Sequence, residues 1–134
     1  MKVAVIYWSG TGNTEQMAQA IAEGAGADLF AVSDFSGKLD AYDRVAFGCS
    51  AMGDEVLEES EFEPFFAEVE GELSGKTIAL FGSYGWGDGE WMRTWEEDCG
   101  AAGINRVSDS VICCEAPDDE ALAACRALGR KLAE

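Results

Sequence analysis

Short runs of apolar residues, rich in β-branched and aromatic side chains, recur along the chain and predict strands. They cover residues 3–7, 29–32, 44–49 and 77–81, and the segment 104–114 holds a fifth. Their apolar residues follow one another instead of alternating with polar ones. Continuous runs of this kind are typical of strands buried on both faces, as in a parallel sheet.

Between these runs, apolar residues recur at the three- and four-residue spacing of a buried helix face. The spacing predicts helices over residues 13–24, 62–73, 91–99 and 118–132. Ser60 with Glu63 is expected to form a capping box at the start of the second helix, and Asp118 to cap the last. The core-facing side chains expected on these helices are Met17, Ile21, Phe62, Phe65, Phe66, Val69, Leu73, Trp91, Trp95, Cys99, Leu122, Cys125, Leu128 and Leu132.

Strands and helices alternate, which predicts an α/β fold with a five-stranded parallel sheet and helices on both faces. The 134 residues are the size of one domain, so residues 1–134 are expected to form a single unit. No apolar run approaches the roughly 20 residues that span a bilayer. The N-terminus also lacks the long apolar stretch and cleavage site of a signal peptide, so we expect a cytoplasmic protein.

The chain is strongly acidic, with 26 Asp and Glu against 9 Lys and Arg and a net charge of −17. Such a surface repels nucleic acid and anionic lipid, and it attracts a partner with a basic face. Solubility alone is the other interpretation, and charge does not separate the two. The most marked acidic cluster lies between Asp54 and Glu63.

Cysteine and histidine usage argues against several kinds of site. The five cysteines are odd in number and form no C-x-x-C pair, and the chain has no histidine. Disulfide frameworks and zinc or iron–sulfur sites therefore lose support, and the commonest general base is missing. Buried thiols are expected at Cys49, Cys99, Cys113, Cys114 and Cys125.

The loop after the first strand has the composition of a phosphate cradle. It reads Ser9-Gly10-Thr11-Gly12-Asn13-Thr14 and leads directly into a predicted helix N-terminus. Its glycines allow close backbone approach, its side chains offer neutral donors, and the helix end favours an anion. It lacks the lysine of a P-loop, and Glu15 stands where a dinucleotide fingerprint has its third glycine. A glycine-rich turn without a ligand is the alternative.

Two more strand-end loops are unusual, and ligands of open parallel sheets bind at this edge. They read Ser50-Ala51-Met52-Gly53-Asp54-Glu55 and Ser83-Tyr84-Gly85-Trp86-Gly87-Asp88-Gly89. A tryptophan between glycines is costly to leave in water, so Trp86 is expected to pack on something flat. The alternative is that it folds back onto the sheet edge. Trp91 and Trp95 are assigned to core packing.

Together the three loops closely resemble the FMN-binding loops of flavodoxins, and most closely those of the short-chain clostridial type. The resemblance covers nearly the whole chain. It implies the strand order 2-1-3-4-5, of which flavodoxin is a standard example, with FMN at the switch between strands one and three. The long-chain subtype carries an extra loop in the last strand, and the segment from Ile104 to Asp118 has no room for it.

The resemblance also implies roles for individual residues. Ser9, Thr11, Asn13 and Thr14 would hold the phosphate together with the loop N–H groups. Ser50 and Ser83 would lie near the phosphate and ribityl chain, Met52 and Trp86 would cover the two ring faces, and Glu55 would accept from the flavin N3–H. Gly85 and Asp88 would line the pyrimidine side. The implied cofactor-binding set is Ser9, Gly10, Thr11, Gly12, Asn13, Thr14, Ser50, Ala51, Met52, Gly53, Asp54, Glu55, Ser83, Tyr84, Gly85, Trp86, Gly87 and Asp88.

The function implied is that of a low-potential one-electron carrier that works through a neutral semiquinone and an anionic hydroquinone. In this family the peptide after the equivalent of Gly53 turns over on one-electron reduction, which glycine permits. The acidic stretch Asp54, Glu55, Glu58, Glu59, Glu61 and Glu63 would disfavour the second negative charge. Expected partners are redox proteins with basic docking faces, such as ferredoxin or flavodoxin reductases and low-potential acceptor enzymes. A monomer is expected.

Three other functions are alternatives. A small FMN-dependent reductase or redox activator of the same fold needs open space over the ring, which Trp86 and Met52 would block. A response regulator needs acidic residues where Ser9 and Ser50 stand. A glycine-rich module for another phosphate ligand is the third, and the colour of the purified protein distinguishes it from a flavoprotein.

Overall fold

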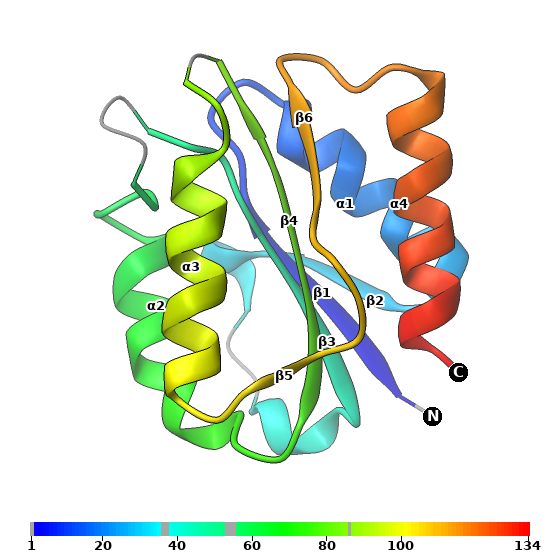
Figure 1. Ribbon diagram of the computed structural model, residues 1–134. Helices are drawn as coiled ribbons and strands as arrows, with labels where there is room; N and C mark the ends of the chain where they lie inside the picture. Colours follow the sequence, from blue (N-terminus) through cyan, green and yellow to red (C-terminus); the bar gives the residue numbers. More distant parts are fainter. Residues whose placement is uncertain (1, 36–37, 53–55, 86) are drawn as a thin grey trace.

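The chain folds around one parallel β-sheet (Figure 1). The computed structural model describes residues 2–35, 38–52, 56–85 and 87–134. Within these residues the strands are β1 (Val3–Trp8), β2 (Asp28–Ala31), β3 (Arg44–Cys49), β4 (Thr77–Tyr84), β5 (Asn105–Arg106) and β6 (Val111–Cys114). Their order is β2-β1-β3-β4-β5, with β6 also paired to β4, and every pairing is parallel. The predicted order 2-1-3-4-5 is confirmed.

The expected fifth strand is broken into β5 and β6, which pair with the two ends of β4. Val111 is five residues after Arg106, whereas their partners on β4, Ile78 and Phe81, are only three residues apart. The two extra residues leave the sheet between β5 and β6. At this break Ser110 and Arg106 donate to the Glu96 carboxylate at 2.6 and 2.8 Å. The expected single strand is thus two short strands, and the polar side chains at the break donate hydrogen bonds to a glutamate of α3.

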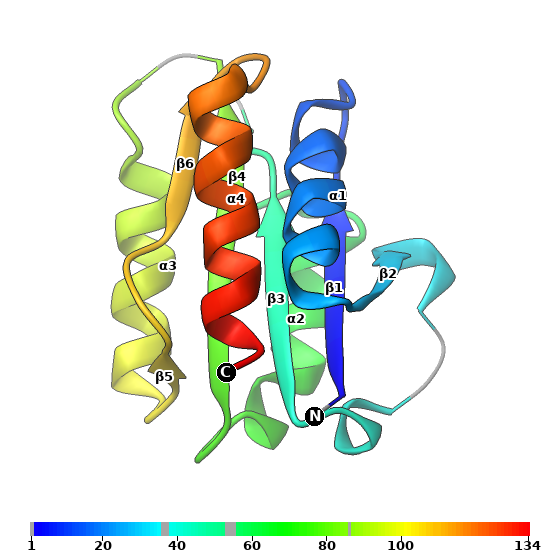
Figure 2. The same cartoon turned by 90° about the vertical axis from the view of Figure 1, so that its right-hand side faces the viewer.

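Helices cover both faces of the sheet. They are α1 (Asn13–Ala25), α2 (Phe62–Val69), α3 (Glu90–Ala101) and α4 (Asp119–Leu132), with short 3₁₀ turns η1 (Val32–Asp34), η2 (Leu39–Ala41) and η3 (Glu70–Glu72). Figure 2 shows α1 and α4 on one face, with α2 and α3 behind the sheet. In the part of the chain that the structure describes, none of these helices is long and apolar enough to cross a membrane.

Two apolar cores lie on the two faces of the sheet. Val5 of β1 joins the core beneath α1 and α4, and its neighbour Ile6 joins the core beneath α2 and α3. Successive strand residues point to opposite faces, which explains why β1 needs an unbroken apolar run. The predicted inward positions are buried except Phe65 and Leu122, which are half-buried against the same cores.

Helices α1 and α4 pack closely enough that two glycines are required. A Cβ on Gly24 would lie 2.1 Å from the carbonyl oxygen of Arg126, and a Cβ on Gly129 would lie 2.2 Å from that of Ile21. Both distances are far below van der Waals contact. The glycines thus set the spacing between the two helices.

The helix caps confirm one prediction and correct another. Asp118 caps α4 by accepting from the N–H of Ala121 at 2.8 Å. Ser60 and Glu63 do not form the expected capping box, since α2 begins at Phe62 with Glu61 at its N-cap. The carboxylate of Glu58 takes the place of the Ser60 hydroxyl and accepts from the N–H groups of Ser60, Glu61 and Phe62.

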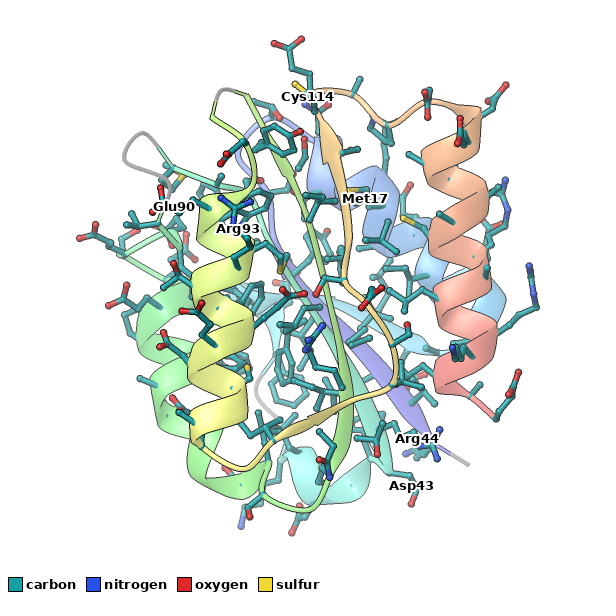
Figure 3. The ribbon with its side chains drawn as sticks, viewed as in Figure 1. Met17, Asp43, Arg44, Glu90, Arg93 and Cys114 are labelled. Atoms are coloured by element: carbon teal, nitrogen blue, oxygen red, sulfur yellow. The ribbon has the colours of Figure 1, made fainter. Side chains whose placement is uncertain are left out.

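The cysteines are not all buried as expected. Burial raises the pKa of Cys49, Cys99 and Cys125 to about 12, so these thiols stay protonated at neutral pH. Cys113 is half-buried and Cys114 is exposed. Figure 3 shows Cys114 at the carboxyl end of β6. The prediction was wrong there because successive residues of β6 face opposite sides of the sheet: Cys113 packs against the core beneath α1 and α4, whereas Cys114 faces the other side and is exposed.

Candidate functional site

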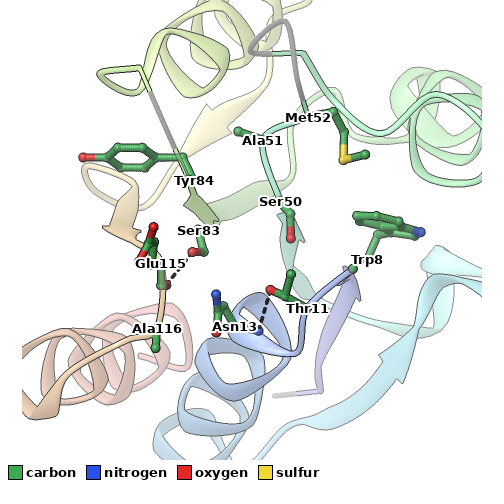
Figure 4. Close-up of a pocket in the computed structure, with 12 residues that line it drawn as sticks. Trp8, Thr11, Asn13, Ser50, Ala51, Met52, Ser83, Tyr84, Glu115 and Ala116 are labelled. Carbon is green, nitrogen blue, oxygen red and sulfur yellow. Dashed lines mark hydrogen bonds between the residues drawn. The ribbon is translucent and has the colours of Figure 1, made fainter.

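A pocket of about 600 Å³ opens at the carboxyl ends of the strands (Figure 4). The register from Val3 and Arg44 to Trp8 and Cys49 brings the ends of β1 and β3 level, and β4 and β6 end beside them. The volume is typical of a cofactor site. Its lining consists of Trp8, Gly10, Thr11, Asn13, Ser50, Ala51, Met52, Ser83, Tyr84, Gly85, Glu115 and Ala116.

The loop between β1 and α1 turns sharply at Gly12. The φ of Gly12 is +93°, a conformation that favours glycine, and its N–H donates to the Ser9 hydroxyl at 3.0 Å. Gly12 is also the N-cap of α1, so the helix begins without a capping side chain. A Cβ on Gly10 would meet the Trp8 ring at 3.0 Å. The loop therefore lies against the indole and presents a helix N-terminus, which favours an anion.

Three hydroxyl side chains join the pocket loops to one another. Thr14 is fully buried, and its Oγ1 lies 2.8 Å from the Ser50 Oγ and accepts from the Ser83 N–H at 3.2 Å. The Ser83 hydroxyl donates to the carbonyl of Glu115 at 2.6 Å. The first turn of α1 is thereby bound to the ends of β3, β4 and β6. These hydrogen bonds hold the hydroxyl groups of the pocket in place.

The segment after β3 reaches the pocket with two backbone hydrogen bonds. The N–H of Ala51 donates to the Ser83 carbonyl, and that of Met52 donates to the Val56 carbonyl, both at 3.0 Å. The Met52 side chain is 38% exposed. Figure 4 shows Met52 beside Trp8, with Tyr84 on the opposite side of the pocket. An apolar surface thus flanks a centre made of hydroxyls.

Charged groups at this edge are mostly engaged elsewhere. Glu15 accepts from the Tyr7 hydroxyl at 2.8 Å, and burial together with this bond raises the pKa of Tyr7 to about 12. Asp88 pairs with Arg93 at 2.9 Å on the surface. Among the described lining residues, Glu115 is the single carboxylate and no lysine or arginine occurs. An anion bound here would meet neutral donors and a helix N-terminus.

The structure brings most of the predicted residues together. Gly10, Thr11, Asn13, Ser50, Ala51, Met52, Ser83, Tyr84 and Gly85 line the pocket. Thr14 lies beneath it, while Ser9 and Gly12 border a neighbouring hollow of about 400 Å³. Gly87 and Asp88 are described but do not line the pocket, and Gly53, Asp54, Glu55 and Trp86 lie outside the described residues.

Trp8, Glu115 and Ala116 line the pocket and were missed. Trp8 ends β1 and reads as a strand residue, whereas Glu115 and Ala116 follow β6. Glu115 is the only described non-glycine residue with a positive φ, at 59°, and its N–H donates to the Tyr84 carbonyl at 2.7 Å. The strand-end rule could have found this segment, had it been applied to the last strand as well.

Comparisons with known proteins agree with this geometry. The flavodoxin family model matches residues 5–129. A flavodoxin of Clostridium beijerinckii is 50% identical over 135 residues, which cover 96% of this chain and 97% of the relative. The chain belongs to the flavodoxin family. A flavodoxin of Megasphaera elsdenii is 44% identical and covers 98% of both chains. The similarity to a short-chain clostridial flavodoxin is thereby confirmed.

Solved flavodoxin structures share the fold. The two-electron-reduced flavodoxin of Megasphaera elsdenii, a solution structure, superposes with a TM-score of 0.82 at 42% identity over 98% of each chain. A flavodoxin from the domain Archaea gives a TM-score of 0.86 at 31% identity and covers 99% of this chain and 96% of its own. As a member of the flavodoxin family, the chain is a small FMN-binding electron carrier and not an enzyme.

The pocket suits FMN on its own features. Apolar side chains of Trp8, Met52 and Tyr84 flank it, as a flat ring system requires. Hydroxyls of Thr11, Ser50 and Ser83 lie nearer the start of α1, where a phosphate finds free helix N–H groups.

Proposed function

We propose that this pocket is the FMN site and that the protein carries single electrons at low potential between redox proteins. The supporting observation is the meeting of a helix N-terminus that has no capping side chain with a pocket of neutral donors. In this proposal, residues 9–14 hold the phosphate by N–H and hydroxyl groups, and the ring lies toward Met52 and Tyr84. Bound FMN supplies the redox chemistry by taking up and releasing electrons.

The residues of the chain orient and shield the cofactor. The Thr14, Ser50 and Ser83 network fixes the spacing between the phosphate end and the ring end of the pocket. Met52 and the predicted stacking residue Trp86 would exclude water from the ring, and Gly53 would permit the peptide turn that separates the two one-electron potentials. Replacement of Gly53 by Ala should narrow that separation.

Charge on the protein supports a low potential. A reduced cofactor gains negative charge beside the Glu115 carboxylate, in a chain of net charge −17. Like charges disfavour one another most where water is excluded. Within the described part of the acidic stretch, Glu58 is buried and bonded by backbone donors, whereas Glu59, Glu61 and Glu63 are exposed, so solvent screens their charges.

The exposed acidic residues also fit the expected partners. Reductases and low-potential acceptor enzymes with basic faces would be drawn to this surface and released quickly, as a carrier requires. A monomeric, cytoplasmic protein is the form in which we propose that it acts.

Spectroelectrochemical titration of the protein reconstituted with FMN tests the proposal. We expect one FMN per chain, bound with quenched fluorescence, and two separate one-electron steps. A single two-electron step would contradict single-electron transfer. Failure of the apoprotein to take up FMN would contradict the assignment of the pocket.

A further inference from the structure

Glu58 is the one charged residue that is buried in the described part of the chain. Its exposed fraction is 6%, and the other buried polar residues there are Thr14 and Ser83, which tie the pocket loops together. Burying a carboxylate is costly unless hydrogen bonds satisfy it. The sequence around it, residues 58–63, is otherwise an exposed acidic run broken by Phe62.

The carboxylate of Glu58 is fully engaged by donors. One oxygen accepts from the Glu61 N–H at 2.7 Å and the Phe62 N–H at 2.9 Å. The other accepts from the Ser60 N–H at 2.8 Å and from the Ser60 hydroxyl. An ionised carboxylate accepts on both oxygens and has no O–H that must donate, which matches a site made of donors alone. A glutamine would turn an NH₂ group toward two of these donors.

The backbone of Glu58 contacts the strand that leads into the pocket. Its N–H donates to the Cys49 sulfur at 3.4 Å, and Cys49 is the last residue of β3. Ser50, Ala51 and Met52 follow directly and line the pocket. The Cys49 carbonyl is held from the other side by the Trp91 indole N–H at 3.2 Å.

Glu58 therefore lies at the point where the chain comes back to β3 after Met52. Met52 is bound across that segment by its N–H to the Val56 carbonyl, and Glu58 is two residues beyond Val56. The backbone N–H of Glu58 donates to Cys49, which precedes Met52 in the chain. The Glu58 carboxylate accepts from the N–H of Phe62 at the start of α2. These bonds fix the residues that follow Met52 relative to the strand β3 that precedes it.

We propose that Glu58 is a positioning residue that holds Met52 against the FMN pocket and thereby sets FMN affinity and the spacing of the two one-electron potentials. The proposal rests on the binding of FMN in this pocket. A carboxylate that only started α2 would matter for folding alone, because α2 does not line the pocket. The two roles differ in what they do to the cofactor.

The test compares Glu58→Gln with Glu59→Gln. Both variants remove one negative charge next to the same segment, but Glu59 is exposed. The measurements are the Kd of the apoprotein for FMN by fluorescence quenching, both midpoint potentials, and the unfolding temperature of the apoprotein. We expect Glu58→Gln to weaken FMN binding at least fivefold and to change the separation of the potentials. Glu59→Gln should keep the Kd within twofold of the parent chain.

The outcomes distinguish a failure of the role proposed for Glu58 from a failure of the FMN-site assignment. If Glu58→Gln lowers the unfolding temperature but matches Glu59→Gln in Kd and in both potentials, Glu58 is a folding residue and the proposal is wrong. If Glu58→Gln does not fold, Ser60→Ala replaces it, since it removes one donor to the same carboxylate. A Kd unchanged in Ser60→Ala would also overturn the role. If the parent chain binds no FMN, the pocket assignment itself fails.

Discussion

The Oγ1 of Thr14 lies 2.8 Å from the Oγ of Ser50, a residue 36 positions further along the chain. The contact joins the first turn of α1 to the end of β3 beneath the pocket. Thr14 also accepts from the Ser83 N–H, so one hydroxyl bonds the ends of two strands, β3 and β4. A residue that the loop motif marks as a phosphate donor thus also supports the site from below.

Replacement of Thr14 by Val should destabilise the apoprotein. The methyl group fills the space of the hydroxyl, but the Ser83 N–H and the Ser50 hydroxyl lose their partner in a buried place. An unsatisfied buried group costs about 1–3 kcal/mol of unfolding free energy. Urea unfolding of the apoprotein measures this. Thr11→Val is the control, because Thr11 is exposed and its Oγ1 accepts a long bond of 3.5 Å; it should cost less than about 0.5 kcal/mol.

Gly129→Ala should destabilise the fold although alanine favours helices. The new Cβ would lie 2.2 Å from the Ile21 carbonyl, so α1 and α4 would have to move apart. Overpacking of this kind costs about 1–3 kcal/mol. Gly100→Ala in α3 is the matched control, since a Cβ there meets no atom within 4 Å. It should gain up to about 1 kcal/mol from helix propensity. Equal effects of the two substitutions on urea unfolding would refute the packing explanation.

Glu58 should make stability depend on pH in the acid range. Burial on its own raises the pKa of Glu58, but its hydrogen bonds from Ser60, Phe62 and Glu61 outweigh burial and hold the pKa below the ordinary 4.5. A carboxyl with a lowered pKa stabilises the fold fully above its unfolded pKa and loses that contribution as the pH falls through the folded one. The unfolding free energy should therefore drop below about pH 4.5.

Urea unfolding of the parent chain and Glu58→Gln across the pH range tests this linkage. Near neutral pH the parent should be more stable by about 1.5–3 kcal/mol, the value of hydrogen bonds to a charged group. The difference should shrink in acid, once Glu58 is protonated in the parent. A difference that stays constant down to the lowest pH would show that the charge of Glu58 is not involved.

Electron transfer to a partner with a basic face should slow as salt is added. At 1 M ionic strength charges are screened beyond about 3 Å, against about 10 Å at 0.1 M. With a net charge of −17, steering should supply tenfold or more of the association rate at low salt, on the order of known cases. Stopped-flow reduction by a basic reductase at rising salt measures it. A rate independent of salt would argue against charge-guided docking.

The parts of the fold that could be predicted are those carried by local pattern. The run Val3–Tyr7 is apolar throughout because both faces of β1 are covered, and the glycine loop after it follows from its own residues. Glu58 could not be recognised in this way. A glutamate in an acidic run is expected at the surface. It is buried here because the N–H groups of residues 60–62 turn toward its carboxylate, while its own N–H donates to the sulfur of Cys49 at the end of β3.

The missed pocket residues have a similar cause. Glu115 carries neither glycine nor a motif, and its place in the pocket depends on the break between β5 and β6, which shifts the register of the last strand against β4. Ser108-Asp109-Ser110 is a local turn signal, but it does not show that the chain returns to β4 after the turn. The contact of Ser110 with Glu96 that maintains the excursion spans 14 positions. Long-range contacts of this kind are invisible to periodicity.

Glu115→Gln should raise the potential of the second electron. Glu115 supplies the one carboxylate among the described lining residues, and a reduced cofactor there is an anion beside an anion. Removing that charge lowers the cost of the second reduction, because like charges repel one another; Glu115 is exposed, so solvent keeps the shift small. The first potential should change less, provided that the first electron is taken up together with a proton.

The control for this prediction is Glu120→Gln, which removes the same charge from the exposed first turn of α4. Both variants keep the backbone at position 115, so the bonds of its N–H to Tyr84 and of its carbonyl to Ser83 remain. Redox titration of the two reconstituted variants then isolates the effect of a charge within the pocket. Equal shifts in both would assign the low potential to the overall charge of the chain, and a lowered second potential in Glu115→Gln would contradict the electrostatic explanation.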